Sequence, residues 1–225
     1  EDVGHRTMSH PWVVTLGAEV AVMVSGNAMA HVYCAVRSRT RPSVGEPRWR
    51  ALSDALLARP SVDLLAARRA DRVVVRSADR GDASVWRTQS GFHYARESGD
   101  PLGVGGDVCG ASDEDAHDLT IETDYPDSIV QLVHLVSSTR SGDIVLSAAR
   151  DWDFRARYEP IRHVSSHGAL HREHMLVPLL TNRPLAETPR RTVDVMPSAL
   201  AAVGAPMPSV LDGRSFLSRR TVLAR

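Results

Sequence analysis

Apolar residues recur along this chain in two patterns, as short β-branched runs and as longer segments with helical spacing. Apolar residues that alternate with polar ones or fill a short run between turn residues favour strands, whereas recurrence every three or four positions favours amphipathic helices. The two patterns follow each other from one end of the chain to the other. This succession is typical of the α/β class.

A hairpin is predicted near the start of the chain. Apolar residues dominate 19–24 and 28–36, and Ser25-Gly26-Asn27 between them have the composition of a tight turn. The other elements expected in the first half are a helix from Trp49 that Pro60 ends, strands over 62–66 and 73–75, and a second hairpin formed by 83–86 and 92–94 around Gly91.

Residues 100–118 interrupt the apolar pattern. They are rich in Gly and Asp and contain few large apolar side chains, which predicts an exposed accessory loop, an insertion or a lid. Beyond this loop we expect a helix that begins at Tyr125-Pro126-Asp127, buried strands over 144–148 and 175–180, and a helix over 192–203 that Gly204 ends.

The charge of the chain limits the kinds of molecule that it is expected to bind. Its 225 residues carry 27 basic and 27 acidic side chains, and every basic one is Arg. A net charge of zero argues against nucleic acid or an anionic membrane as the main partner. Because the Arg residues are mixed with carboxylates, we expect a solvated surface of both signs.

Other sequence features concern the cellular setting. No window approaches about 18 consecutive apolar residues, so no membrane span is predicted. Cys34 and Cys109 are too few for a disulfide framework, which favours a reducing cytoplasm. The first residue is Glu1 and not Met, and we expect that an N-terminal part of the protein is missing from this sequence.

Four histidines, His163, His167, His171 and His174, lie close together in the sequence. On one helix the last three would share a face, which suggests a zinc site, but the spacing is not that of HExxH and Ser165-Ser166-His167-Gly168 resembles a loop. Surface histidines are the alternative interpretation.

Two carboxylates, Asp151 and Asp153, follow the run 144–148, where strand ends of open α/β sheets bind ligands. A turn cap and an ion pair with Arg155 or Arg157 are the alternative. Nucleophile-elbow, P-loop and dinucleotide motifs are absent from the sequence.

Four segments of the last third occur in a recognisable order. They are Ser165-Ser166-His167-Gly168, then Met175-Leu176-Val177-Pro178-Leu179-Leu180, then Arg191 to Leu200 with Gly204, and finally Leu211-Asp212-Gly213-Arg214-Ser215. This succession resembles the closing part of the alkaline phosphatase superfamily, in its type I phosphodiesterase/nucleotide pyrophosphatase branch. The resemblance is firm from about Asp143 onward, and Ser25 to Ala30, Gly99 to Leu102 and Tyr125 to Asp127 also look like that branch.

The resemblance implies a layered α/β sheet with helices on both faces, of which residues 1–225 are the C-terminal portion, with the accessory loop 100–118. It implies two divalent metals, expected to be zinc, and makes His167 a metal ligand, because a neutral imidazole followed by a glycine suits such a site. Asp194 matches a structural position near a helix start.

The match is incomplete at the beginning of the chain. The nucleophile of the family, a Thr or Ser, precedes this sequence, as do further ligands. The family's Asp-His-Gly ligand pair would fall near Asp2, which makes Asp2 a second candidate ligand, but Val3 stands in the place of the histidine. His5 is the nearest histidine to that position.

Three hypotheses follow from these observations. The first is the C-terminal part of a metal-dependent phosphoric-ester hydrolase, acting on a small phosphate ester and inactive without its upstream nucleophile. The second is a degenerate member of the same fold that binds or supports other molecules. The third is an independent zinc module formed by the histidines at 163–174.

Overall fold

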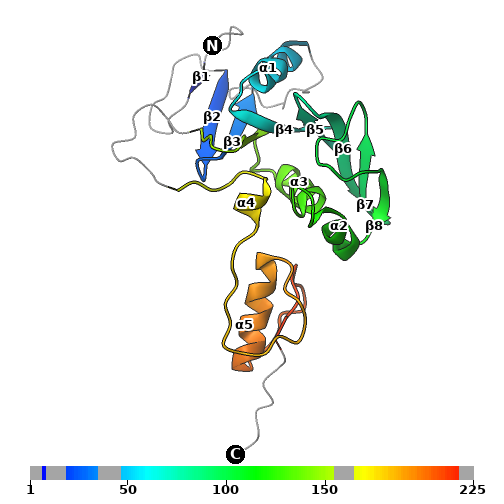
Figure 1. Ribbon diagram of the computed structural model, residues 1–225, viewed down its shortest axis with the longest axis vertical. Coiled ribbons are helices and arrows are strands. Elements are labelled where there is room, and N and C mark those ends of the chain that lie inside the picture. Colours follow the sequence, from blue (N-terminus) through cyan, green and yellow to red (C-terminus); the bar gives the residue numbers. More distant parts are fainter. Residues whose placement is uncertain (1–6, 9–18, 35–46, 155–164, 218–225) are drawn as a thin grey trace, which may run out of the picture. The chain divides into compact units, whose positions relative to one another are not determined.

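The computed structural model describes residues 7–8, 19–34, 47–154 and 165–217 (Figure 1). The chain divides into two compact units, Glu1–Leu176 and Val177–Arg225, and each is described by itself. None of the helices within the described ranges has the length and apolar character that a membrane crossing requires.

The described residues of the first unit form one sheet of nine strands in the order β1-β2-β3-β9-β4-β5-β6-β7-β8. Strands β2 to β9 pair with their neighbours in antiparallel fashion, and β1 lies parallel to β2. The strands are β1 (Thr7–Met8), β2 (Val20–Ser25), β3 (Met29–Cys34), β4 (Val62–Arg69), β5 (Arg72–Ser77), β6 (Gly81–Thr88), β7 (Gly91–Arg96), β8 (Val108–Ala111) and β9 (Ile144–Ala148).

The hairpin predicted at the start of the chain is confirmed as β2 and β3. Ser25 pairs with Met29, and Gly26 and Asn27 in the turn have φ angles of 64° and 68°. Positive φ suits glycine, and asparagine tolerates it better than most residues, so this short sequence closes the hairpin at little steric cost. The second hairpin, β6 and β7, is also confirmed.

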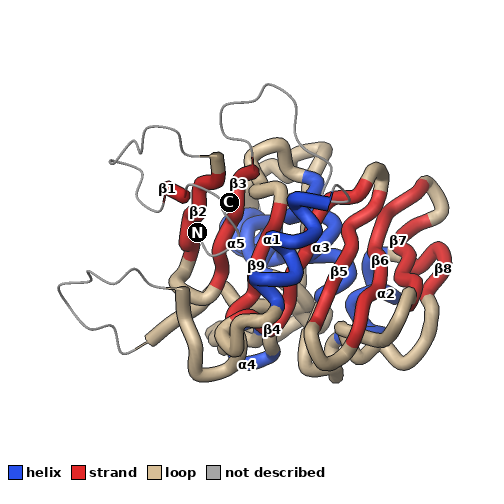
Figure 2. Tube along the Cα trace, turned by 90° about the horizontal axis from the view of Figure 1, so that it is seen from above, coloured by secondary structure: helices blue, strands red, loops and turns tan. Residues whose placement is uncertain are grey.

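Helices cover both faces of the sheet (Figure 2). Helices α2 (Asp113–Thr120) and α3 (Ser128–Ser137) pack on one face, where Ile129, Val133 and Val136 contribute to the larger core. Helix α1 (Pro47–Leu57) packs on the other face through Trp49 and Leu52. The α/β class and the helices α1 and α3 are therefore as expected.

Strand β9 is at the centre of the sheet and connects its two halves. It pairs with β3 on one side and with β4 on the other, and all five of its residues are buried. Val145 faces the core under α3, whereas Leu146 faces the core under α1. A buried strand was predicted here, but its antiparallel pairing differs from the parallel sheet ends invoked for Asp151 and Asp153.

The expectation of an exposed loop over 100–118 is wrong for much of that segment. It contains β8 and most of α2, and Leu102, Ala111 and Ala116 are buried in the core. The sequence did not indicate this burial, because only one large apolar side chain, Leu102, is fully buried there, and small or partly buried residues (Ala111, Ala116, Val104 and Val108) supply other contacts with the core.

The strand expected over 175–180 is also absent from the structure. Met175 ends the short helix α4 (Arg172–Met175), and the residues from Leu176 to Leu180 are exposed and belong to no helix or strand. An apolar run without a partner strand has no ladder of hydrogen bonds, so its composition alone did not determine its conformation.

The second unit is built around α5 (Val195–Val203), which follows the 3-10 turn η1 (Thr192–Asp194). Gly204 ends α5 with φ of 70°, as predicted. Asp194 precedes the helix, but its carboxylate accepts hydrogen bonds from the backbone N–H groups of Arg190, Arg191 and Arg214 and not from those of α5. It thereby joins two loops of this unit.

Candidate functional site

His167 is fixed to the turn of the β2–β3 hairpin by its backbone. Its N–H donates to the carbonyl of Gly26 over 2.9 Å, and its carbonyl accepts from the N–H of Ala28 over 3.0 Å. The residue is exposed. The following Gly168 has φ of 103°, which lets the chain turn sharply beside the hairpin.

The segment after β9 reaches the same turn. The N–H of Phe154 donates to the carbonyl of Asn27 over 2.6 Å, so Asp153 and His167 both belong to segments that are bonded to the β2–β3 turn. Asp151 is exposed and adopts a φ of 65°. The structure thus brings together two sequence candidates, Asp153 and His167, at one end of the sheet. Arg155 and Arg157, the expected partners of the carboxylates, lie outside the described residues.

His171 and His174 form a pair with ring centroids 4.2 Å apart. The Nδ1 of His174 accepts a hydrogen bond from the N–H of Ala169, whereas the buried Nδ1 of His171 has no hydrogen-bond partner within the described ranges. Burial lowers the pKa of both rings, which favours neutral imidazoles. Because His167 lies in extended backbone, the three histidines do not share one helical face.

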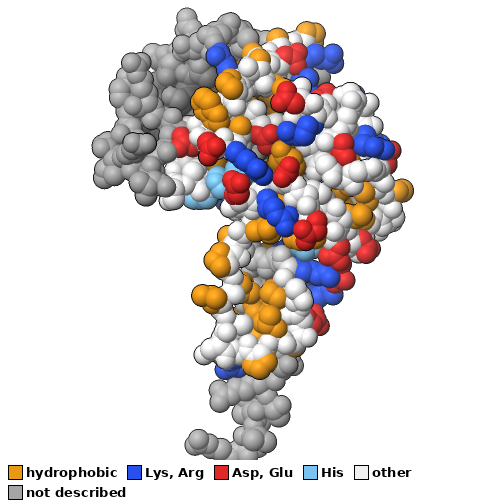
Figure 3. Space-filling view, viewed as in Figure 1, with side chains coloured by type: hydrophobic (Ala, Val, Ile, Leu, Met, Phe, Trp, Pro, Cys, Tyr) orange, Lys and Arg blue, Asp and Glu red, His pale blue; other side chains and the backbone are white. Residues whose placement is uncertain are grey.

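Ion pairs hold α4 beside the segment between α2 and α3. Arg150 contacts Asp124 at 3.2 Å and Glu173 at 3.6 Å, and Arg172 contacts Glu122 at 3.2 Å. Basic and acidic side chains alternate over the visible face of the first unit in the same manner (Figure 3). The mixed charged surface predicted from the sequence is present in this unit, and its pairs neutralise one another locally.

A further cluster of polar side chains lies at the start of β4, and no sequence pattern indicated it. Asp63 accepts hydrogen bonds from Arg80 over 2.6 Å and from the hydroxyl of Tyr125 over 2.8 Å. Burial, followed by the hydrogen bond to Asp63, raises the pKa of Tyr125. The three residues are far apart in the sequence, so no spacing rule could have joined them.

The described residues include only some of the candidate metal ligands. Asp2, His5 and His163 lie outside them, so the candidate ligand Asp2 has no structural account. Among the described residues, no group of three or more His, Cys, Asp or Glu side chains is placed to hold a metal. His167 is therefore a single candidate donor here, and these residues do not form a metal centre by themselves.

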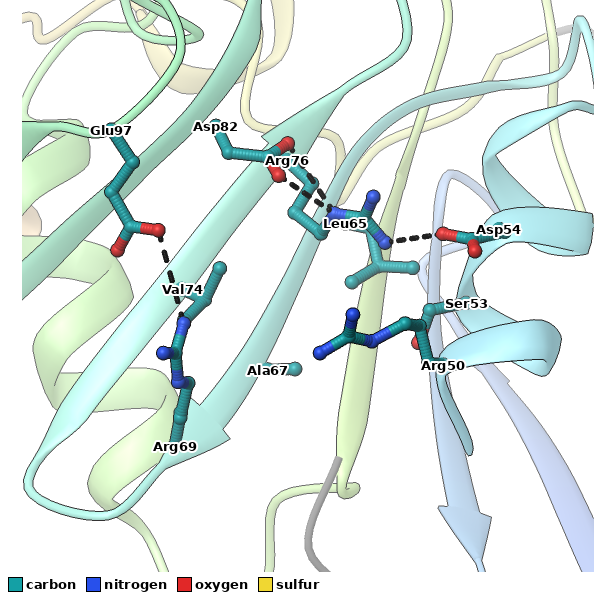
Figure 4. A pocket seen from close by; sticks show the side chains of 10 residues that line it. All are labelled: Arg50, Ser53, Asp54, Leu65, Ala67, Arg69, Val74, Arg76, Asp82 and Glu97. Atoms are coloured by element: carbon teal, nitrogen blue, oxygen red, sulfur yellow. Dashed lines mark hydrogen bonds and ion pairs between the residues drawn. The ribbon is translucent and has the colours of Figure 1, made fainter. Parts of the chain in front are cut away.

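A cavity of about 380 Å³ lies elsewhere in the first unit, between α1 and strands β4, β5 and β6 (Figure 4). Arg76 is held between Asp54, at 2.8 Å, and Asp82, at 3.2 Å. No sequence pattern indicated that these residues form a site. The ten lining residues are Arg50, Ser53, Asp54, Leu65, Ala67, Arg69, Val74, Arg76, Asp82 and Glu97.

Comparisons with protein-family models, with curated proteins and with solved structures find no match for this chain. The relation to the alkaline phosphatase superfamily therefore stays a prediction from the sequence motifs. The setting of His167 on the hairpin turn is the structural feature that bears on this prediction.

Proposed function

We propose that this chain is the C-terminal part of a metal-dependent phosphoric-ester hydrolase of the alkaline phosphatase superfamily. In this proposal His167 is a metal ligand, and the nucleophile and most other ligands belong to upstream chain. The proposed cofactors are two divalent metals, expected to be zinc, and the substrate class is a small phosphate ester. The ordered motifs of the last third support the family.

The single observation that carries the proposal is the setting of His167. Two backbone hydrogen bonds fix the residue on the hairpin turn, while its side chain stays exposed. A metal ligand needs this combination, because a fixed backbone limits the entropy lost on binding and an accessible ring nitrogen can reach an ion. His171 and His174 do not offer it, since one ring is buried and the other accepts a hydrogen bond.

Metals bound at such a site would stabilise the negative charge on the phosphoryl oxygens. The role of the described residues is to position the ligand. Gly26 and Ala28 hold the backbone of His167, and Phe154 holds the segment of Asp153 on the same turn.

The test uses the polypeptide encoded by the complete reading frame that contains this sequence. With zinc or manganese added, we expect hydrolysis of bis-p-nitrophenyl phosphate or a nucleotide ester, and we expect the isolated 225-residue chain to be inactive. His167→Ala should reduce the bound metal and the rate by about tenfold or more. His134→Ala, a change at an exposed histidine of α3, should leave both unchanged.

A complete protein that hydrolyses no phosphate ester with either metal contradicts the proposal. One observation favours a second candidate, a degenerate member that binds without catalysis: Val3 stands where the family pattern has a ligand histidine. Metal analysis separates the two, because stoichiometric metal that depends on His167 supports the hydrolase, whereas a folded protein without bound metal supports the degenerate member.

A further inference from the structure

The cavity beside α1 differs in its lining from the site proposed around His167, and what is argued for it does not depend on that proposal. We call it the arginine cavity, after the three arginines that line it, Arg50, Arg69 and Arg76. It forms because α1 covers only part of its face of the sheet. Beside the helix, polar side chains of β4, β5 and β6 surround an apolar floor (Figure 4).

The floor of the cavity consists of Leu65, Ala67 and Val74. Leu65 and Ala67 are buried in the core under α1, so half-buried Val74 offers the accessible apolar surface of this floor. A volume of about 380 Å³ is sufficient for a small organic molecule, whose apolar part would be removed from water on this floor.

One of the three arginines is fully engaged. Arg76 contacts Asp54 from α1 and Asp82 from β6, and these contacts fix its guanidinium in the wall. The hydrogen bond to Asp54 and the charge of Asp82 raise the pKa of Arg76 against the opposing effect of its burial. Arg76 is therefore a neutralised part of the wall.

The other two arginines retain binding capacity. Arg69 meets Glu97 only at 3.8 Å, and that carboxylate also accepts a hydrogen bond from Ser84. Arg50 has no ion pair with any residue in the described part of the chain, and Figure 4 shows its guanidinium directed toward the space above Ala67. Three arginines and three carboxylates line the cavity, and the guanidinium of Arg50 is the one whose N–H groups are not engaged by a carboxylate of the described residues.

We propose that the arginine cavity binds a small molecule with an oxyanion, a carboxylate or a phosphate, and an apolar body. The oxyanion accepts hydrogen bonds from Arg50, with Arg69 as a second cation, because the planar guanidinium matches the spacing of paired oxygens. The apolar body rests on Val74, above the buried Leu65 and Ala67. Asp54, Asp82 and Glu97 exclude polyanions from the rest of the cavity by repulsion.

The experiment titrates the 225-residue chain with benzoate, phenyl phosphate and inorganic phosphate, observed by calorimetry and by backbone NMR shifts. We expect saturable binding of benzoate or phenyl phosphate at millimolar concentration, with shifts in β4 and α1, and weaker binding of inorganic phosphate, which lacks an apolar body. The comparison of benzoate with phenyl phosphate identifies which oxyanion the cavity prefers.

Three variants test the assignment of residues. Arg50→Gln should weaken binding about tenfold or more, because a charge-assisted hydrogen bond is lost. Glu97→Gln should strengthen binding, because it removes a competing negative charge near Arg69, and an unfolded variant could not produce such a gain. Arg87→Gln, at an exposed arginine of β6 that packs over Phe92, should bind as the unmodified chain does.

No saturable binding of any probe at millimolar concentration overturns the proposal. Equal affinities of the unmodified chain and Arg50→Gln overturn it as well, since binding would then occur elsewhere. Shifts confined to residues outside β4, β5, β6 and α1 lead to the same conclusion.

Discussion

Gly26 is the residue at which the hairpin turn and the segment of His167 come closest. A Cβ atom at this position would lie 2.5 Å from Nδ1 and 2.8 Å from the backbone oxygen of His167. Gly103 has nearly the same backbone conformation, with φ of 67° against 64°, but a Cβ there would meet nothing within 4 Å. A comparison of substitutions at the two glycines therefore distinguishes the effect of backbone strain from that of steric contact.

Gly26→Ala is expected to lower the free energy of unfolding by about 3 kcal/mol, because backbone strain and a forced shift of His167 add together. Gly103→Ala should lower it by only about 1 kcal/mol, since strain acts alone. Urea unfolding followed by circular dichroism measures both. Equal losses in the two variants would show that His167 does not pack on the turn as described.

At the scale of elements, the second unit shows how one carboxylate organises a short helical segment. The backbone N–H groups of Arg190 and Arg191 donate to Asp194 over 3.0 Å, and that of Arg214 donates over 2.9 Å. Burial alone would raise the pKa of Asp194, but these donors outweigh it and lower the pKa. The ionised carboxylate therefore stabilises the folded unit.

Asp194→Ala should destabilise the second unit by about 2 kcal/mol, since charge-assisted hydrogen bonds to three N–H groups are lost. Hydrogen exchange of the α5 amides measures this effect, and Asp212→Ala, at an exposed carboxylate, is the control. Because the folded pKa is lowered, the stabilisation is complete above the unfolded value of about 3.9 and is lost as the pH falls through the folded pKa. A difference between the variants that persists at lower pH would contradict this role.

Strand β9 determines the organisation of the first unit as a whole. It follows β8 in the sequence but lies between β3 and β4, so the hairpin and the following strands share one sheet only through it. Its neighbouring residues Val145 and Leu146 belong to different cores. A substitution that destabilises β9 is therefore expected to destabilise the strands on both sides of it.

Leu146→Ala should lower the free energy of unfolding by about 3 kcal/mol, the usual effect of a cavity at a buried leucine. Hydrogen exchange should become faster in both β3 and β4, the two neighbours of β9. Leu119→Ala, at an exposed leucine of α2, should change stability by less than about 0.5 kcal/mol. Faster exchange in β3 with unchanged exchange in β4 would mean that β9 does not couple the two halves.

Much of the local structure was predictable, because apolar periodicity and turn residues act over a few positions. The turn at Gly26 and Asn27, the stripe of α3 and the end of α5 at Gly204 are confirmed. The predictions for 100–118 and 175–180 were wrong, because alanines carried part of the burial in one segment and the other has no partner strand.

The candidate sites were harder to predict from the sequence than the helices and strands were. The resemblance singled out His167, which the structure places on the hairpin turn, but its role as a metal ligand stays a prediction, and Asp2 lies outside the described residues. The contacts of Asp63 with Arg80 and Tyr125, and the cavity containing Arg50 and Arg69, had no sequence pattern, because their members come from separate elements.

The sequence by itself determined the class of the fold, the positions of most helices and strands, and the mixed charge of the surface. Only the tertiary structure decided the strand order, the central place of β9, the setting of His167 and the existence of the arginine cavity. The physical reason is the distance along the chain over which each kind of interaction acts. Periodicity and turn chemistry depend on neighbouring residues, whereas strand pairing and cavities depend on side chains that meet only when distant segments pack.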